Sequence, residues 1–489
     1  MTTTEIGPAG SSTRARNPWL AFAVLAAAQF LMVLDVSVVL VALPSVQGEL
    51  GFSQTGLAWV MNAYILAFGG FLLLGGRAAD VFGHRRILLA GMAILGVTSI
   101  ACAVSAAPWQ LVAARGGQGL SAAIACPAAM ALVFELFSSQ ADRNKALAIF
   151  GSVGGLSGAI GSPFGGLLTA VGWQWVFLFN VPAVIIVVVL GMRMLPSRRG
   201  QVAGGMDVTG SLAVTGGLCA LIFAVLHGGS TSWTSGSTLT AFVVAAALLA
   251  AFAVRQVRAS SPLIPRALFR LGNVVVGNIA NLMTGALLFG IFFVLTLHLQ
   301  QDRGYEPLQA AVTTMPVCLA LFLGAQALPR VLGRIAPVPA LAGSLGLIGL
   351  GLVWWASALS ADANVITAFV LPGMVWSFGT GASIVAGTVV CTMGVDETVS
   401  GAAAGLVNTT LQVGGAVGVA VFSTIAVNRS GALTAQGSDL PTALTSGNAY
   451  ALAGGVGVAV LGVLITLVLL RRRPAASPVP EQAASTAGS

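Results

Sequence analysis

Asp35, Arg115 and Glu135 are charged residues that lie inside long apolar stretches of the sequence. A charged side chain at the centre of a membrane helix costs about 2.5–3.5 kcal/mol, so each one needs a reason to be there. A buried carboxyl group near a cation can take up and release a proton close to neutral pH. We therefore predict that Asp35 handles protons or cations, with a structural ion pair to Arg115 as the alternative. Arg115 is expected to tune a carboxylate or bind substrate, unless it only hydrogen-bonds to the backbone.

Glycines recur around Pro163, in the apolar stretch that runs over residues 145–170. Small residues at such spacings let two membrane helices approach closely, and a proline kinks the helix that contains it. A phosphate-binding loop is excluded, because no Lys-Ser or Lys-Thr pair follows the glycines. We predict close helix packing with a hinge role. The glycines given this role are Gly158, Gly161, Gly165 and Gly166.

The composition fits a membrane protein. The chain has 489 residues, of which 57% are hydrophobic and 7% charged, whereas an ordinary soluble domain is about 25% charged. The net charge of +8 does not point to nucleic acid as a partner, because the arginines occur in short clusters between apolar runs. The five cysteines lie in apolar segments without paired spacing, so neither disulfides nor a metal site are expected. The expected surroundings are therefore a lipid bilayer.

The elements that must position these residues are apolar helices of about 20 residues, the length that crosses a bilayer. They predict an all-α polytopic membrane protein whose parts are a cytoplasmic tail (1–17), a six-helix bundle (18–198), an inserted transmembrane hairpin (207–256), a second six-helix bundle (270–470) and a disordered tail (474–489). The fourteen predicted spans are 18–43, 55–74, 86–106, 109–137, 145–170, 174–195, 208–227, 237–256, 271–299, 307–328, 337–358, 364–389, 399–427 and 448–470.

The basic residues predict the direction of insertion. With the N-terminus in the cytoplasm, 19 of the 22 lysines and arginines fall in cytoplasmic segments. Arg303 and Arg429 would lie outside, and Arg115 would lie within the membrane. Because cytoplasmic loops carry an excess of Lys and Arg, we expect a multi-pass protein of the cytoplasmic (inner) membrane with both termini inside.

A short loop over residues 76–86 joins the second and third spans and places Asp80 before a basic cluster. On composition alone it is a solvated loop that fixes topology. A faint repeat relates spans 1–6 to spans 9–14, which would make spans 7 and 8 an inserted hairpin. Two such halves around a midplane site are a known plan for transporters. The repeated loop motifs are Gly83-His84-Arg85 and Gly333-Arg334.

These stretches resemble the major facilitator superfamily, and in particular its fourteen-span drug:proton antiporter branch. The resemblance covers roughly residues 18–470, and the loop over 76–86 looks like the family signature between helices 2 and 3. The other similar stretches are Leu34 to Pro44 in the first span, Arg115-Gly116-Gly117-Gln118-Gly119 in the fourth, the glycines up to Gly165-Gly166 in the fifth, and Trp173 to Phe177 with Asn180-Val181-Pro182 at the sixth.

The resemblance implies a role for each matching residue. Asp35 matches the first-span acid of the family, which is implied to bind protons, and Arg115 matches an arginine associated with proton coupling. The fifth-span glycines match those typical of exporters. The loop signature implies ion pairs that hold an outward-open state. Its matching residues here are Gly76, Asp80, Gly83 and Arg85.

The sequence departs from the family pattern at a few positions. Val81 and His84 stand where basic residues are usual, and Ser162 stands where a proline is expected, with Pro163 displaced by one. An arginine in place of His84 would pair permanently with an acid at the end of the fourth span, for which Glu135 is the candidate. A histidine pairs only when it is protonated, so this latch is expected to be weaker or sensitive to cytoplasmic pH.

A substrate pocket is expected between the two halves, where spans 1, 4, 9 and 12 should face each other. We expect no acid other than Asp35 in a cavity position, which argues against electrostatic selection of multiply charged cations. The candidate contacts are Asn62, Gln118, Asn281, Phe289, Phe292, Phe293, Trp376, Asn408 and Gln412.

The combined prediction is export of hydrophobic drugs or antibiotics by alternating access. The proton gradient would drive it, without a cofactor, in a protein that acts as a monomer. Proton-coupled import of a nutrient is the first alternative, which the fifth-span glycines disfavour. A membrane-embedded enzyme is disfavoured because His227 and His298 are isolated in the sequence. A passive channel is disfavoured because no ring of like charges or repeated filter segment is visible.

Overall fold

The computed structural model describes residues 17–137, 139–197, 207–259, 268, 270–332, 334–360, 363–395 and 400–471. All regular structure in these ranges is helical, with three short π-helical segments among the α-helices. Lipid offers no hydrogen-bond partners, so every backbone N–H and C=O of a spanning segment must be satisfied within the helix itself. The all-α fold class predicted from the sequence is confirmed.

The helices fall into a first half, a hairpin and a second half. The first half contains α1 (Pro18–Leu50), α2 (Gln54–Phe82), α3 (His84–Ala103), α4 (Pro108–Leu136), α5 (Gln140–Val171), α6 (Trp175–Leu178) and α7 (Asn180–Met194). The hairpin consists of α8 (Val208–Ser230) and α9 (Gly236–Arg258). The second half contains α11 (Gly272–Gly285), η1 (Ala286–Gly290), α12 (Ile291–Leu297), η2 (His298–Asp302), α13 (Pro307–Leu332), α14 (Pro337–Ala358), η3 (Ile366–Val370), α15 (Leu371–Thr392), α16 (Ser400–Ala435) and α17 (Leu440–Arg471), where η marks a π-helical segment.

Local signals set the ends of α1. The Asn17 side-chain oxygen accepts a hydrogen bond from the backbone N–H of Trp19 at 3.1 Å, which caps the first turn. The helix then continues through Pro44 to Leu50, beyond the predicted end at residue 43. Proline has no backbone N–H, so one helix carbonyl loses its donor. A membrane helix tolerates this loss because neighbouring groups satisfy that carbonyl. Gly51 ends the helix at φ +71°, a conformation that favours glycine.

Twelve helices among the described residues are long and apolar enough to cross a membrane, and thirteen if the bent α2 counts as one span. The bend in α2 is 52°, between Gly56–Leu72 and Leu74–Phe82. α5 occupies the remaining predicted span, and among its described residues an apolar run covers Ile160–Val171. The predicted total of fourteen is therefore reached only if α5 also crosses the membrane.

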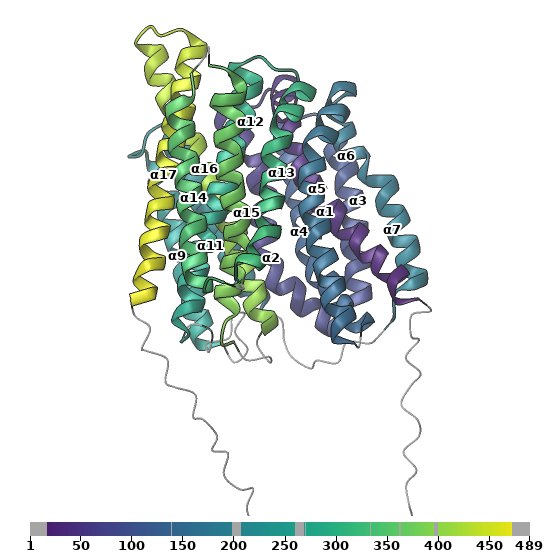
Figure 1. The fold of residues 1–489 in the computed structure, drawn as a ribbon. Helices are drawn as coiled ribbons and strands as arrows, with labels where there is room; N and C mark the ends of the chain where they lie inside the picture. Colours follow the sequence, from purple (N-terminus) through teal and green to yellow (C-terminus); the bar gives the residue numbers. More distant parts are fainter. Residues whose placement is uncertain are drawn as a thin grey trace, which may run out of the picture.

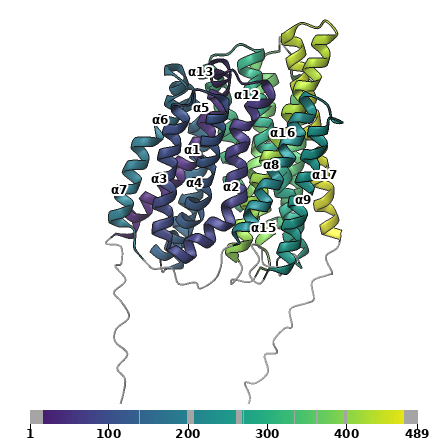
Figure 2. The same cartoon turned by 180° about the vertical axis from the view of Figure 1, so that it is seen from behind.

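The helices pack around two main hydrophobic cores. One core is built mostly from α1 to α7, and the other from α11 to α17. Figures 1 and 2 show these two groups on opposite sides of the bundle, with the start of α1 and the end of α17 at the same end. In the hairpin, α8 packs against α9 and also against α2 and α16.

An ion pair ties the two ends of the hairpin together. Arg255 at the end of α9 contacts Asp207, the residue that caps the start of α8. Burial raises the pKa of the Asp207 carboxyl, but hydrogen bonds from Arg255, from the Gly210 N–H and from Thr209 outweigh it, so the pKa lies below the ordinary value of 3.8. Asp207 is therefore charged at neutral pH and keeps its partner.

The two halves meet along two equivalent helix pairs. α2 packs against α16, and α5 packs against α13. α2 and α13 are the second spans of their halves, and α5 and α16 are the fifth. Each pair therefore joins the second span of one half to the fifth span of the other, as expected for two repeated halves. The hydroxyl groups of Ser162 on α5 and Thr314 on α13 lie 3.2 Å apart. A carbon added at Gly166 would lie 2.8 Å from Cβ of Ala311, so the close approach of α5 to α13 depends on this glycine.

Candidate functional site

Asp35 lies in the middle of α1 and faces α4 and α7 of the same half. Its side chain and that of Arg115 on α4 are both 0% exposed, and Arg115 Nη1 donates to Asp35 Oδ2 at 2.7 Å. The other carboxylate oxygen, Oδ1, accepts from Asn180 Nδ2 on α7 at 2.7 Å and from Gln118 Nε2 on α4 at 3.2 Å. The ion pair that the sequence left open is therefore present.

A second layer of polar groups holds these partners in place. Gln118 Nε2 donates to the Ser99 hydroxyl on α3 at 2.8 Å, and Asn180 Nδ2 lies 3.3 Å from the same hydroxyl. Gln118 Oε1 accepts from Arg115 Nη1 at 2.7 Å. Arg115 Nε donates to the backbone carbonyl of Val60 on α2 at 3.1 Å. The carboxylate of α1 is thus linked to α2, α3, α4 and α7.

The network balances one negative and one positive charge in a place without water access. Breaking such a buried pair by removing one partner costs about 3–5 kcal/mol, because the other charge stays behind uncompensated. The Arg115 guanidinium also lies 4.6 Å from the centre of the Tyr64 ring, a cation–π contact that favours its charged form. A proton bound to Asp35 would leave the charge of Arg115 without its partner.

Asp80, His84 and Glu135 meet where α2 joins α3, beside the end of α4. His84 Nδ1 lies 2.6 Å from Glu135 Oε1, and His84 Nε2 lies 3.2 Å from Asp80 Oδ1. Carboxylates only accept hydrogen bonds, so both contacts are satisfied together only by an imidazole that carries a proton on each nitrogen. The structure brings His84 to the acid predicted as its partner and adds Asp80 on its other side.

The other predicted loop residues shape the same corner. Gly83 separates α2 from α3 with φ +97°, a conformation that favours glycine. Arg85 donates to the backbone carbonyl of Met192 near the end of α7. A carbon added at Gly76 would make an ordinary contact with Pro127 at 3.6 Å, so space alone does not require glycine there. The function of this group as a conformational latch stays a prediction.

The glycines of α5 let this helix approach α1. A carbon added at Gly161 would collide with the Ser37 side chain, and one at Gly165 would lie 2.8 Å from a backbone carbonyl oxygen of α1. Pro163 lies between them and is half-buried. Gly158 is in the same helix, but its surroundings lie outside the described residues. The close approach is thus explained by Gly161 and Gly165, while the hinge role stays a prediction.

The residues predicted to contact substrate lie in several places. Gln118 belongs to the Asp35 network described above, and Asn408 is exposed. Asn62 and Asn281 are buried, and both polar side-chain atoms of Asn62 and Oδ1 of Asn281 have no hydrogen-bond partner within the described ranges. Phe293 lines a pocket in the second half. The remaining candidates, all buried or half-buried, are Phe289, Phe292, Trp376 and Gln412.

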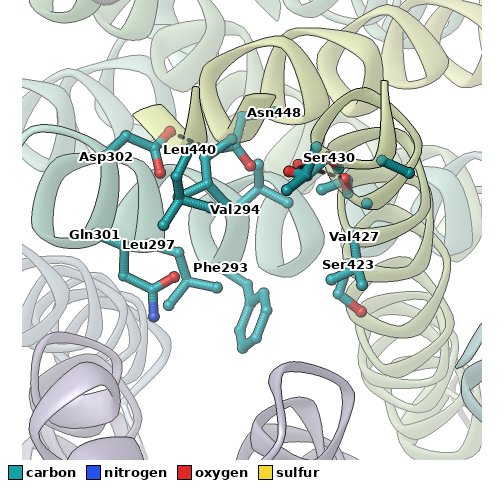
Figure 3. Close-up of a pocket in the computed structure, with 15 residues that line it drawn as sticks. Phe293, Val294, Leu297, Gln301, Asp302, Ser423, Val427, Ser430, Leu440 and Asn448 are labelled. Atoms are coloured by element: carbon teal, nitrogen blue, oxygen red, sulfur yellow. Dashed lines mark hydrogen bonds between the residues drawn. The ribbon is translucent and has the colours of Figure 1, made fainter. Parts of the chain in front are cut away.

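Asp302 is a charged residue that the sequence prediction missed. Its side chain is 2% exposed, and it lines the same pocket of the second half, whose volume is about 450 Å³ (Figure 3). The expectation that no acid other than Asp35 occupies a cavity position is therefore wrong. His298 is not isolated either, because its Nδ1 lies 2.7 Å from Asp302 Oδ2. The spacing of four residues was the available signal, but Asp302 lies beyond the predicted end of its span at residue 299.

Comparison with known proteins places the chain in a family. A model of the Major Facilitator Superfamily matches residues 25–419. The chain is 37% identical over 470 residues to the cephamycin export protein CmcT of Amycolatopsis lactamdurans, which covers 94% of this chain and 93% of that protein. It is 36% identical over 471 residues to the puromycin resistance protein pur8 of Streptomyces alboniger, and the match covers 94% of this chain and 92% of that protein.

A solved structure agrees on the fold. A bacterial homologue of the human lysosomal transporter Spinster, in an inward-facing and unoccupied conformation, gives a TM-score of 0.68 at 14% identity and covers 94% of this chain and 99% of that one. The helical bundle and these similarities define a multi-pass membrane transporter. The chain belongs to the major facilitator superfamily.

Proposed function

We propose that this protein exports hydrophobic antibiotics across the bacterial cytoplasmic membrane in exchange for protons, by alternating access. The names of its relatives support export, since one is an export protein for cephamycin and another a resistance protein for puromycin. The similarity extends over nearly the whole length of both. The distribution of basic residues supports an orientation with both termini in the cytoplasm.

The proton part of this proposal depends on the buried Asp35–Arg115 pair. A proton on Asp35 would cancel its attraction for Arg115 and weaken the hydrogen bonds that Gln118 and Asn180 donate to it. α1 would then be held less tightly to α4 and α7. Coupling requires that Asp35 does not hold its proton while substrate is carried outward. The proton gradient is the driver in this proposal, and no cofactor takes part.

The energy available sets the scale of the expected effect. One proton charge that returns across 100 mV releases about 2.3 kcal/mol. At about 1.4 kcal/mol per tenfold gradient, this supports a substrate gradient of roughly 50-fold if one net charge moves per cycle. A monomer suffices for such a cycle, because both halves of the transporter are present in one chain.

The first experiment replaces Asp35 with asparagine in protein reconstituted into liposomes. A pH gradient is imposed, and the accumulation of puromycin against its own gradient is measured. We expect the wild type to accumulate puromycin and Asp35→Asn to reach only equilibration, because asparagine cannot carry the proton. Glu49→Gln is the matched control, since Glu49 is an acid of the same helix that only accepts hydrogen bonds from Trp173 and Gln174 at its end.

The same assay separates the proposal from its alternatives. Undiminished accumulation by a folded Asp35→Asn variant would remove the role given to Asp35. Movement of puromycin in the same direction as protons would identify an importer. Wild-type transport that does not respond to a protonophore would rule out proton coupling altogether.

A further inference from the structure

A pocket in the second half lies apart from the Asp35 network and from the His84 cluster. It is formed by α12, η2, α16 and α17, at the end of the bundle opposite the start of α1, and its volume is about 450 Å³. Pockets for small organic ligands typically measure about 300–1,000 Å³. Its walls are mostly apolar and include Phe293, Leu297, Val427 and Leu444. The pocket is therefore of the right size and character for a hydrophobic molecule.

Asp302 supplies the charge of this pocket. Its Oδ2 accepts from His298 Nδ1 at 2.7 Å and from Asn448 Nδ2 on α17 at 2.7 Å, and Figure 3 shows Asp302 joined to Asn448 at the rim of the pocket. Its Oδ1 has no hydrogen bond within the described part of the chain. One carboxylate oxygen is thus fixed by two donors, while the other has none among the described residues.

The surrounding structure holds the acid rigidly. His298 and Asp302 begin and end the π-helical segment η2, and such segments are rare and often occur at functional sites. The His298 ring stacks on Phe369 of η3, with ring centres 6.2 Å apart and planes at 16°. Phe369 packs in turn against Trp355 at 5.1 Å. A carboxylate that is held in this way needs little reorganisation to receive a cation.

Arg303 and Arg429 contact groups other than Asp302. Arg303 is next in sequence, but its guanidinium donates to the carbonyls of Ser360 and Ala363. Arg429 on α16 is exposed and lies over the Tyr450 ring at 5.5 Å. A neutral imidazole with its proton on Nδ1 suffices for the contact of His298 with Asp302. With a neutral imidazole the pocket keeps one negative charge.

We propose that this pocket binds a hydrophobic organic monocation, with its positive centre on Asp302 and its apolar body against the walls formed by α12, α16 and α17. Phe293 is a buried part of the apolar wall. The inference names a substrate class for the proposed exporter and so rests on that proposal, but binding at this site requires neither a gradient nor turnover.

The test measures binding of tetraphenylphosphonium to purified protein in an uncharged maltoside detergent, by equilibrium dialysis. Triphenylphosphine oxide serves as a neutral probe of related shape. We expect Asp302→Asn to weaken tetraphenylphosphonium binding about tenfold or more, because a buried charge partner is lost, and to leave the neutral probe unchanged. Asparagine can still accept from His298 and Asn448 through its amide oxygen, so the local hydrogen bonds are kept.

A second pair of variants tests the pocket without touching the acid. Leu444→Trp fills the pocket and should weaken binding of both probes, whereas Leu464→Trp on the same helix places the same side chain at an exposed position outside it. This pair decides the question even if Asp302→Asn does not fold, as judged by gel filtration. Wild-type affinity for tetraphenylphosphonium in a folded Asp302→Asn or in Leu444→Trp would overturn the proposal.

Comparing the two assays separates this inference from the proposed transport mechanism. We expect Glu49→Gln to bind tetraphenylphosphonium with wild-type affinity, because Glu49 lies in the other half of the molecule and contacts Trp173 and Gln174. If proton-driven export fails while binding stays sensitive to Asp302, the mechanism is wrong and the site stands. If export is proton-driven but Asp302→Asn keeps wild-type affinity for tetraphenylphosphonium, the proposed binding site is wrong and the transport mechanism stands.

Discussion

At the residue scale, a proton would change the contacts of Asp35 and of His84 in opposite ways. A proton on Asp35 breaks an ion pair, because Arg115 and the carboxylate balance each other only while both are charged. A proton on His84 makes contacts possible, because each of its nitrogens faces a carboxylate oxygen. The first group lies deep in the bundle, and the second lies at the junction of α2 and α3. The two groups therefore lie in different parts of the molecule.

We predict that His84→Arg makes the protein less sensitive to rising pH. In the wild type, loss of the His84 proton leaves Asp80 and Glu135 as neighbouring negative charges, and each hydrogen bond to a charged group is worth about 1.5–3 kcal/mol. Arginine keeps its charge throughout, so the contacts survive. We expect the melting temperature of the wild type in detergent to fall more steeply than that of His84→Arg as the pH rises above neutral.

The transport rate gives a second measurement of the same variant. The transport rate of the wild type should depend on the pH on the side of the membrane where the α2–α3 junction lies. The rate of His84→Arg should depend less on this pH. His227→Arg is the control, because His227 lies near the end of α8, outside the α2–α3 junction, with its Nε2 2.8 Å from the Ser237 hydroxyl. Identical pH profiles for the wild type and His84→Arg would show that the cluster does not sense protons.

The sequence predicted which residues are chemically unusual, but not all of their partners. Asp35 and Arg115 are 80 positions apart, and their pairing depends on how α1 and α4 are rotated about their axes, which apolar helices reveal poorly. His84 and Glu135 could be paired in advance because both belong to ends of spans that a family pattern places together. Asp302 was missed because η2 extends the span by residues that were expected to form a loop.

At the element scale, the close approach of α5 to α1 depends on glycines. Gly161→Val adds carbon atoms where Ser37 of α1 already lies. Overpacking of this kind costs about 1–3 kcal/mol, so we expect a lower melting temperature and a smaller amount of folded protein. Gly457→Val on α17 is the control, because no atom lies within 4 Å of a carbon added there. Equal stability of the two variants would mean that α5 can move away from α1 without cost.

Most helices could be predicted in advance, because a span of apolar residues leaves the backbone no other way to satisfy its hydrogen bonds. Their irregularities could not. In the π segments η1, η2 and η3 the hydrogen bonds change from the i→i+4 to the i→i+5 pattern, and no residue type in the sequence predicts this change.

At the scale of the whole molecule, glutamine side chains join the two halves at the end opposite the start of α1. Gln300 Nε2 donates to the backbone carbonyl of Val41 on α1 at 3.0 Å, and Gln301 Nε2 donates to Gln47 Oε1 at 2.7 Å. α1 also packs against α12 and α13 at the same interface. If transport proceeds by alternating access, these contacts between halves must break and re-form in each cycle, whereas contacts within one half need not.

We therefore predict that a reversible cross-link between cysteines at positions 47 and 301 stops transport. The variant is Gln47→Cys with Gln301→Cys, made in a background without the five native cysteines and bridged with a short bifunctional thiosulfonate. Puromycin transport in liposomes should be lost on bridging and return on reduction. The matched control joins Glu49→Cys to Gln174→Cys, whose native side chains contact each other at 3.5 Å within the first half. Bridging this pair should leave transport intact, since the first half moves as a unit. Full transport by the bridged 47–301 variant would mean that this end of the bundle never opens, and an alternating mechanism would then be untenable for this protein.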